Sequence, residues 1–506
     1  MSHYIPSVAI LGIDAKPIII EADVAFGLSS FTIVGLPDAA VKESKERIRA
    51  AIKNTDLPFP RWRVTVNLSP AHLKKQGVLY DLPIAVAILA AQENIIPEKE
   101  HSAVFLGELG LQGEIRPVRG SFVAAVAAKT YGYEHLILPK ENAQEAALVH
   151  GLKIIPVSSL REVVDYLRNI WSPKQVDIPI LLDEKEKNPF VDLADIFGQE
   201  HAKRGLEIAA SGGHNLLLYG PPGSGKTMLA KALPSILPSM SPEEAIEVTK
   251  IYSIANEYGS LSGFISERPY RSPHHSTSAS ALVGGGAWPK PGEVTLAHRG
   301  VLFLDELPEF NRSALEHLRQ PIEDGHVTIS RVSASFTFPS KCMLVAAMNP
   351  CPCGHADDPG VICTCSTSAV HQYRKKISGP LLDRLDLSIS VPRVETEKLT
   401  KRTLGESSET VRKRVEIART RQINRFKNIG IFSNAEMNSR LLHEFGTIDE
   451  AGEKIMRIAT ERLHLSARGY TRIIKMARTI ADLKEEDHIL PSHLSEALTY
   501  RHSLEK

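Results

Sequence analysis

The chain has 506 residues, of which 43% are hydrophobic and 24% charged, and its formal net charge is +1. This length exceeds one ordinary hydrophobic core and predicts roughly two to four domains of ~150 residues. The near-zero net charge excludes a globally basic nucleic-acid-binding protein, so any contact with DNA must come from local patches.

The first residues alternate like strands and carry no basic segment followed by a cleavage site, so they do not predict a signal peptide. The longest apolar run covers residues 82–91, which is far shorter than the ~20 residues that span a bilayer. We therefore expect a cytoplasmic protein without a membrane partner.

The chain order predicts an α/β protein with three structured parts. Residues 1–170 combine strand-like runs with helical patterns and a hairpin at 107–118, so they form one α/β domain. Residues 171–190 lack periodicity and predict a linker. Residues 191–392 alternate strands and helices, which favours a parallel sheet, and residues 393–506 form a helical region rich in Arg, Lys and Glu.

A phosphate-binding loop lies near the start of the part formed by residues 191–392. An apolar strand at 214–219 precedes a full match to GxxxxGK[ST], and a helix follows. The glycines let backbone N–H groups wrap around phosphates, Lys226 reaches the β- and γ-phosphates, and Thr227 binds Mg²⁺. The pattern predicts ATP and Mg²⁺ as cofactors. The nucleotide-binding residues are Gly220, Pro221, Pro222, Gly223, Ser224, Gly225, Lys226, Thr227 and Met228.

Two further apolar strands end in polar residues. Residues 300–304 lead into Asp305, which would hold the Mg²⁺ shell, and Glu306, which would activate the attacking water. Residues 341–348 lead into Asn349, which could position that water (the role called sensor 1). An Asn–Pro pair is alternatively a plain turn former.

Four of the five cysteines crowd into residues 351–365. Cys351, Cys353, Cys363 and Cys365 could surround one tetrahedral Zn²⁺, which would supply the folding energy that this short loop lacks. The C-x-C spacing is tighter than the usual zinc pattern, and His355 could replace one ligand. Reduced free cysteines and redox pairing stay open as alternatives.

Long motifs at 268–275, 284–286, 289–306 and 349–354 resemble the ComM/YifB family of magnesium-chelatase-like AAA+ ATPases. This resemblance implies an AAA+ core with a parallel sheet, followed by a helical lid. It also implies a homo-hexameric helicase that drives branch migration on single-stranded, forked or branched DNA during natural transformation. The alternative is a chelatase-like motor subunit that remodels a protein partner.

The same resemblance implies roles in ATP hydrolysis for two arginines. Arg384 resembles an arginine finger, which would reach the γ-phosphate of a neighbouring subunit; an ordinary ion pair to Asp383 or Asp386 is the alternative. Arg468 resembles sensor 2, and Arg472, one turn later, is held as an alternative.

Two insertions are candidates for the pore of a ring. The loop 276–294 contains Trp288 and Lys290, and the hairpin 325–338 contains Arg331. These side chains could stack on a base or meet phosphates, or the two segments could simply support the fold. The basic residues of 412–427 are expected to form a solvated charged face, with a DNA-facing stripe as the alternative. We expect the neighbouring His274 and His275 to be structural.

Residues 62–130 resemble the proteolytic domain of Lon-type proteases (a ribosomal S5 domain 2-like fold) and a domain of RadA. Leu79 and Phe122 stand where those proteases carry their catalytic Ser and Lys. Neither side chain can act as a nucleophile or a base, so we expect no peptidase activity.

Overall fold

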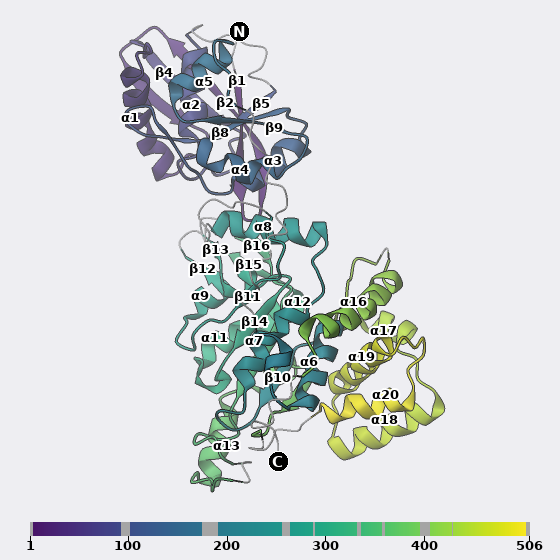
Figure 1. Ribbon diagram of the computed structural model, residues 1–506. Coiled ribbons are helices and arrows are strands. Elements are labelled where there is room, and N and C mark those ends of the chain that lie inside the picture. The colour runs from purple at the N-terminus through teal and green to yellow at the C-terminus, as the bar shows by residue number, and fades with distance from the viewer. Residues whose placement is uncertain are drawn as a thin grey trace. The chain divides into compact units, whose positions relative to one another are not determined.

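The computed structural model describes residues 4–92, 102–174, 191–255, 264–286, 289–330, 335–356, 360–394, 405–427 and 429–501. The chain forms two compact units, whose elements are labelled in Figure 1. The first unit comprises Met1–Glu184 and Ala245–Ile265, and the second comprises Lys185–Glu244 and Ser266–Lys506. Most of the expected linker, 171–190, lies outside the described residues.

The first unit is built around two larger sheets and a short hairpin. In the four-stranded sheet, of order β1-β2-β4-β3, only β3 and β4 are parallel to each other. The three-stranded sheet β5-β8-β9 is parallel, and the expected hairpin is β6–β7. The strands are β1 (Tyr4–Leu11), β2 (Asp14–Ala25), β3 (Ser30–Val34), β4 (Arg63–Ser69), β5 (Ala103–Phe105), β6 (Glu108–Leu109), β7 (Ile115–Arg116), β8 (His135–Pro139) and β9 (Lys153–Val157).

The helices of this unit bury their apolar faces in one core. Helix α2 is buried along its whole length, as its unbroken apolar sequence predicts. The amphipathic α1 begins at an N-cap, where Asp38 accepts a hydrogen bond from the Val41 N–H. The helices are α1 (Ala39–Asn54), α2 (Asp81–Ala90), α3 (Ser121–Thr130), α4 (Ala143–Ala147) and α5 (Leu160–Leu167).

A segment from the middle of the chain also belongs to the first unit. Helix α8 (Pro242–Ala255) follows the phosphate-binding region in sequence, yet its residues from Ala245 onward pack within the first unit. The Gly120 N–H donates to the Ser253 carbonyl at 3.1 Å, and the Phe122 and Phe264 rings meet edge-on at 5.8 Å. The chain therefore leaves and re-enters the second unit around this insertion.

The second unit contains a five-stranded parallel sheet of order β11-β14-β17-β10-β18. Its central strands are continuous buried apolar runs, as expected for a sheet covered on both faces. The hairpin expected at 325–338 is β15 (His326–Ser330) with β16 (Ser335–Pro339). The sheet strands are β10 (Leu216–Tyr219), β11 (Tyr270–Arg271), β14 (Val301–Leu304), β17 (Met343–Met348) and β18 (Leu387–Ser390).

Short and long helices surround this sheet. Helix α7 carries the end of the phosphate loop, and α12 ends at a left-handed Gly325. The helices are α6 (Glu200–Gly212), α7 (Lys226–Ile236), α9 (Ala279–Val283), α10 (Glu293–Leu296), α11 (Arg312–His317), α12 (Arg319–Asp324), α13 (Thr367–Lys375) and α14 (Gly379–Leu382).

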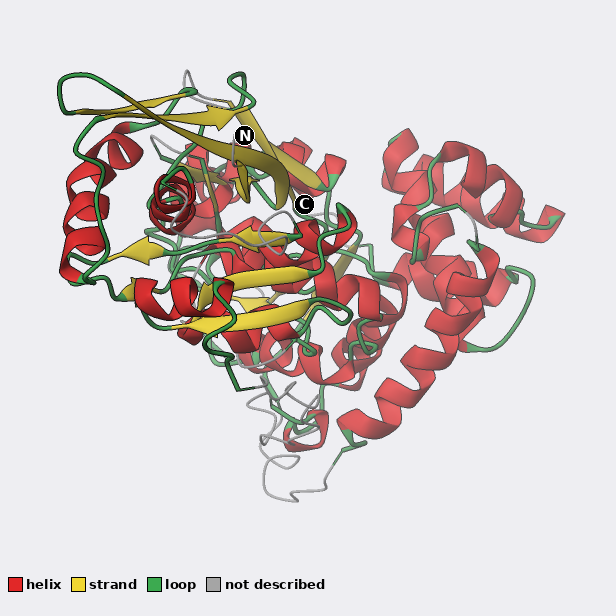
Figure 2. Cartoon of the chain, turned by 90° about the horizontal axis from the view of Figure 1, so that it is seen from above, coloured by secondary structure: helices red, strands yellow, loops and turns green. Residues whose placement is uncertain are grey.

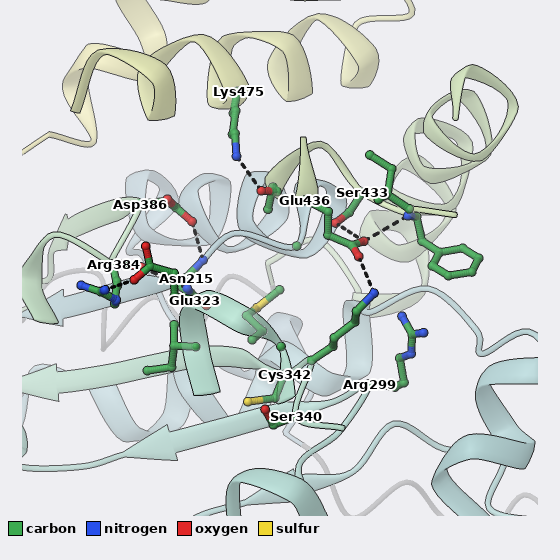
Figure 3. A pocket seen from close by; sticks show the side chains of 18 of the residues that line it. Asn215, Arg299, Glu323, Ser340, Cys342, Arg384, Asp386, Ser433, Glu436 and Lys475 are labelled. Carbon is green, nitrogen blue, oxygen red and sulfur yellow. Dashed lines mark hydrogen bonds and ion pairs between the residues drawn. The ribbon is translucent and has the colours of Figure 1, made fainter. Parts of the chain in front are cut away.

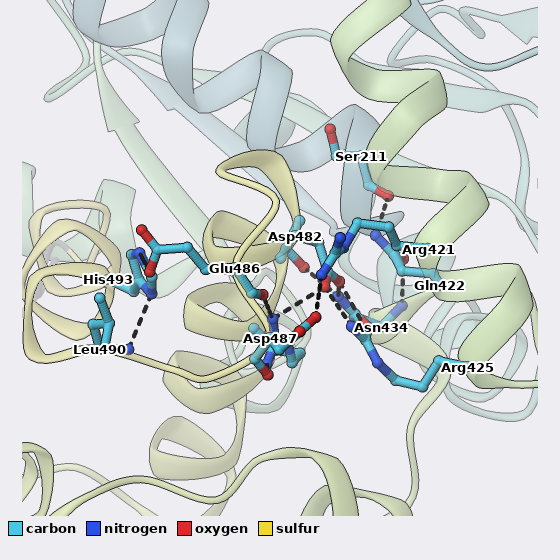
Figure 4. Close-up of polar contacts among 12 residues, drawn as sticks. Ser211, Arg421, Gln422, Arg425, Asn434, Asp482, Glu486, Asp487, Leu490 and His493 are labelled. Atoms are coloured by element: carbon cyan, nitrogen blue, oxygen red, sulfur yellow. Dashed lines mark hydrogen bonds and ion pairs between the residues drawn. The ribbon is translucent and has the colours of Figure 1, made fainter.

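The C-terminal part of the second unit is a group of helices with no strand among its described residues (Figure 2). Its basic helix α16 is largely neutralised: Arg421 pairs with Asp487, and Arg425 pairs with the buried Asp482 (Figure 4). This pairing favours a structural role over a DNA-facing stripe. The helices are α16 (Ser408–Arg425), α17 (Ser439–Phe445), α18 (Glu450–Leu463), α19 (Ala467–Leu483) and α20 (Pro491–Thr499).

The expected α/β class is confirmed, with a parallel sheet followed by a helical C-terminal region. Throughout the part of the chain that the structure describes, each helix is too short or too polar to cross a membrane.

Candidate functional site

The phosphate-binding motif forms a tight turn between β10 and α7. Strand β10 ends at Tyr219 and α7 begins at Lys226, so the loop joins the carboxyl end of a strand to a helix N-terminus. Gly223 and Gly225 have φ angles of +72° and +94°, which favour glycine. A Cβ at Gly220 would lie 2.1 Å from the Val391 carbonyl oxygen, so this position has no room for a side chain.

Side chains from three adjacent strand ends converge on this loop. The Thr227 hydroxyl donates to Asp305 Oδ2 at 2.9 Å, and the Lys226 ammonium donates to Asn349 Oδ1 at 3.1 Å. These contacts follow from the sheet order, because β10, β17 and β14 are parallel neighbours and their carboxyl ends share one edge. The structure thus brings together the four residues that the sequence places in three separate motifs.

The Lys226 side chain is buried at this edge. It also donates to the carbonyl oxygens of Gly220 and Pro221, both at 2.8 Å. Burial lowers the pKa of the Lys226 ammonium, and the nearby Asp305 and Glu306 carboxylates oppose this shift. An oxygen-lined Thr227–Asp305 pair beside a cradle of backbone N–H groups fits Mg²⁺ with the phosphates of a nucleotide.

Glu306 extends from the same edge towards solvent. It has a left-handed φ of 51°, and its side chain is 57% exposed. The imidazole Nδ1 of His275 lies 3.6 Å from Glu306 Oε2, and its ring stands edge-on to Phe310. The sequence predicts a structural role for His275, because the side chains of adjacent residues point in different directions. Only the fold brings its loop beside Glu306.

The cysteine loop follows this edge directly. The four thiols gather so that all sulfur atoms lie within 4.8 Å of one another. Cys363 Sγ lies 3.7 Å from Cys351 Sγ and 3.6 Å from Cys353 Sγ. A tetrahedral zinc site with bonds of about 2.3 Å has sulfurs about 3.8 Å apart, so the donor set fits Zn²⁺. Backbone N–H groups, first that of His355, lower the pKa of Cys353 to about 5, whereas burial and the neighbouring thiols raise the pKa values of Cys363 and Cys365.

The same loop touches the phosphate-binding turn. Gly354 has a φ of +87°, and a Cβ there would lie 2.5 Å from the ring of Pro222. Cys351 stands two residues after Asn349 and is fully buried. A metal bound by the cysteines would therefore stabilise both the Asn349 strand end and one wall of the nucleotide site.

Arg384 and Arg468 lie together at the opposite edge of the sheet. Both donate to Glu323, Arg384 to Oε2 and Arg468 to Oε1, the latter at 2.6 Å; Figure 3 shows the Arg384–Glu323 contact. They line a cavity of about 520 Å³ between the sheet and the C-terminal helices. The carboxylate partner of Arg384 is thus Glu323, and neither of the expected alternatives, Asp383 and Asp386, holds it.

The strand register fixes how far this pair lies from the phosphate loop. The Asn215 side chain, at the amino end of β10, donates to the Arg384 carbonyl at 3.0 Å. The four residues of β10 lie between Asn215 and Gly220, so five residue steps separate this level from the loop, which corresponds to about 17 Å at ~3.3 Å per residue. Arg472, the alternative to Arg468, is buried and pairs with Asp386 at 3.3 Å, so Arg468 is the exposed member of the two.

The predicted DNA contacts are only partly visible. Lys290 is exposed on β13 (Lys290–Pro291), which pairs with β12 (Gly284–Gly285) in a short hairpin. Trp288 and Arg331 lie outside the described residues.

In the first unit, the positions of a Lon-type catalytic pair are apolar and packed. Leu79 is 9% exposed and Phe122 is 1% exposed. The neighbouring Ser121 hydroxyl is fully buried and donates to Glu145 at 2.5 Å, so it does not face substrate. The absence of peptidase activity in this unit stays a prediction.

Comparison with known proteins covers almost the whole chain. Models of magnesium chelatase subunit ChlI match residues 192–399, 20–142 and, for its C-terminal part, 405–501. Over 97% of its length the chain is 43% identical to the protein YifB of Salmonella typhimurium and to the competence protein ComM of Haemophilus influenzae, and it covers 96% of each. The chain belongs to the ComM/YifB family.

Shorter similarities concern other proteins. The archaeal Lon protease of Methanocaldococcus jannaschii is 27% identical over 131 residues, which are 26% of this chain and 20% of that protein. The DNA repair protein RadA of Aquifex aeolicus is 32% identical over 87 residues, or 17% and 18% of the two chains. As a member of the ComM/YifB family, the chain thus combines a magnesium-chelatase-like AAA+ part with a region of Lon-like similarity, which confirms the predicted fold class.

Proposed function

We propose that this protein is an ATP-driven DNA translocase that works as a homo-hexameric ring in the cytoplasm and promotes branch migration. Lys226, Thr227 and Asp305 bind ATP with Mg²⁺, Glu306 activates water, and Asn349 orients it. Magnesium supplies charge neutralisation on the phosphates when bound.

The observation that supports a ring is that the nucleotide-binding residues and the two arginines, Arg384 and Arg468, lie at opposite edges of the sheet. The Arg384 backbone lies at the level of Asn215, about 17 Å along β10 from the phosphate loop of its own subunit at ~3.3 Å per residue, and Arg468 meets Arg384 at Glu323. They can stabilise a γ-phosphate only if a neighbouring subunit presents one. A closed ring supplies such a neighbour to every subunit through one repeated contact.

The DNA substrate is inferred from the relatives. One is named a competence protein, and a shorter similarity leads to a DNA repair protein. We propose that the β12–β13 hairpin with Lys290, and the hairpin with Arg331, line the pore and meet DNA phosphates, with Trp288 stacking on a base. The cysteine loop binds structural Zn²⁺ in this account.

The direct test is ATP hydrolysis with and without single-stranded, duplex and forked DNA, with Glu306→Gln as the control. We expect stimulation that is greatest on forked or branched DNA. The matches to magnesium chelatase favour a second candidate, a motor that remodels a protein partner. An active ATPase without any response to DNA would support that candidate instead.

A further inference from the structure

Glu323 links two elements that the proposed mechanism uses together. It stands near the end of α12, and each of its carboxylate oxygens accepts from a different guanidinium. Arg384 comes from the segment before β18, and Arg468 from the first turn of α19. One negative charge thus holds two positive charges that would otherwise repel each other.

The two arginines depend on Glu323 to different degrees. Arg384 also donates to the carbonyl oxygens of Pro380 at 2.6 Å and Arg319 at 3.2 Å, so its position has other support. Arg468 is 55% exposed, and within the described chain Glu323 is the acceptor of its guanidinium. Removal of the carboxylate would therefore release Arg468 and leave two uncompensated cations side by side.

We propose that Glu323 is a positioning residue for the active site shared between subunits: it assembles Arg384 and Arg468 into one cationic pair before a neighbour presents its γ-phosphate. This inference rests on the proposed function. Charges that are oriented in advance stabilise a transition state without reorganisation, and the cavity beside the pair leaves room for both side chains to turn towards phosphate.

The contact of Glu323 with Arg468 is too exposed to contribute much to folding, because the two side chains are 44% and 55% exposed. The Arg384 side chain is only 11% exposed, but it keeps its hydrogen bonds to the carbonyl oxygens of Pro380 and Arg319 when Glu323 is changed. Glu323→Gln keeps the shape and one acceptor but removes the charge, so the melting temperature should change little. We expect kcat for ATP to fall about tenfold, equivalent to about 1.4 kcal/mol, with KM within about twofold, because ATP binds to the phosphate loop of the neighbour.

Subunit mixing separates this role from a structural one. Glu306→Gln subunits cannot hydrolyse ATP but still donate both arginines, whereas Arg384→Ala subunits have an intact phosphate loop but lack the arginine finger. The mixture should hydrolyse ATP at the interfaces between the two kinds. Glu323→Gln is then added either to the Glu306→Gln subunit or to the Arg384→Ala subunit.

We expect Glu323→Gln to lower the activity of the mixture only when the arginine-donating subunit carries it. Glu316→Gln, which removes the half-buried carboxylate that pairs with Arg319, is the matched control and should have no effect in either position. Equal loss in both positions, or loss in neither, overturns the role of Glu323. If the parent mixture without Glu323→Gln shows no rescue, the shared active site itself is contradicted.

Discussion

The two edges of the parallel sheet in the second unit differ in what they hold. At the carboxyl edge, Lys226, Thr227, Asp305 and Asn349 touch one another through two hydrogen bonds. At the amino edge, Arg384 and Arg468 meet at Glu323. In the proposed function, the first edge binds phosphates and the second supplies cations, so one subunit would contain both halves of an active site that it cannot close alone.

Substitution of a nucleotide-binding residue at the carboxyl edge of the sheet should lower ATP hydrolysis most. Lys226→Ala removes the buried cation that faces the phosphates, and we expect ATP hydrolysis to fall on the order of 10³-fold together with weaker nucleotide binding. Steady-state hydrolysis and titration with a fluorescent nucleotide measure the two effects. Lys231→Ala, on the exposed face of the same helix, is the control and should behave like the native protein.

Loss of the amino edge should leave nucleotide binding intact. Arg384→Ala is expected to lower kcat on the order of 10³-fold, because arginine fingers contribute this much or more, while nucleotide affinity changes little. Arg421→Ala, which removes an arginine of α16 that pairs with Asp487, serves as the control. A large loss of ATP affinity in Arg384→Ala with unchanged kcat would contradict the division between the two edges.

Removal of cysteine ligands from the cysteine loop should lower ATP hydrolysis less than the substitutions of Lys226 and Arg384. Cys351→Ser with Cys363→Ser should abolish zinc binding and lower ATP hydrolysis about tenfold, because Gly354 packs on Pro222 beside the phosphates. Elemental analysis of metal-replete protein and the hydrolysis rate are the two measurements. Cys342 lies outside the cluster, so the Cys342→Ala protein is the control and should retain the metal. Native protein without zinc would contradict the metal site.

The smallest effect is expected for Lys290→Ala, because Lys290 lies in neither group of residues at the two sheet edges. Lys290→Ala removes one exposed cation from the β12–β13 hairpin, so DNA affinity should fall modestly and the slope of its salt dependence should decrease by about 1. Basal ATP hydrolysis should stay unchanged. DNA titrations at several salt concentrations test this, and an unchanged slope would remove Lys290 from the proposed DNA surface.

Contiguous motifs made most of the carboxyl edge predictable. A glycine-rich turn between a strand and a helix, or an apolar run that ends in Asp305, specifies its local geometry through backbone chemistry. The cysteine cluster was also predictable, because four thiols share one short loop. The ranges expected for the domains and the roles assigned to the site residues remain predictions.

Contacts between segments that are distant in the sequence could not be predicted from contiguous motifs. Glu323 is 61 residues from Arg384 and 145 residues from Arg468, and no spacing rule connects them. The same holds for His275 beside Glu306 and for the insertion of 245–265 into the first unit. Only tertiary packing decides these neighbours.

The most direct test of the account is the ATPase activity of a mixture of Glu306→Gln and Arg384→Ala subunits, compared with each variant alone. We predict hydrolysis well above the sum of the two inactive proteins, because each interface between the variants restores one complete site. If the mixture is as inactive as its components, while native protein mixed with itself stays active, the two sheet edges do not cooperate between subunits.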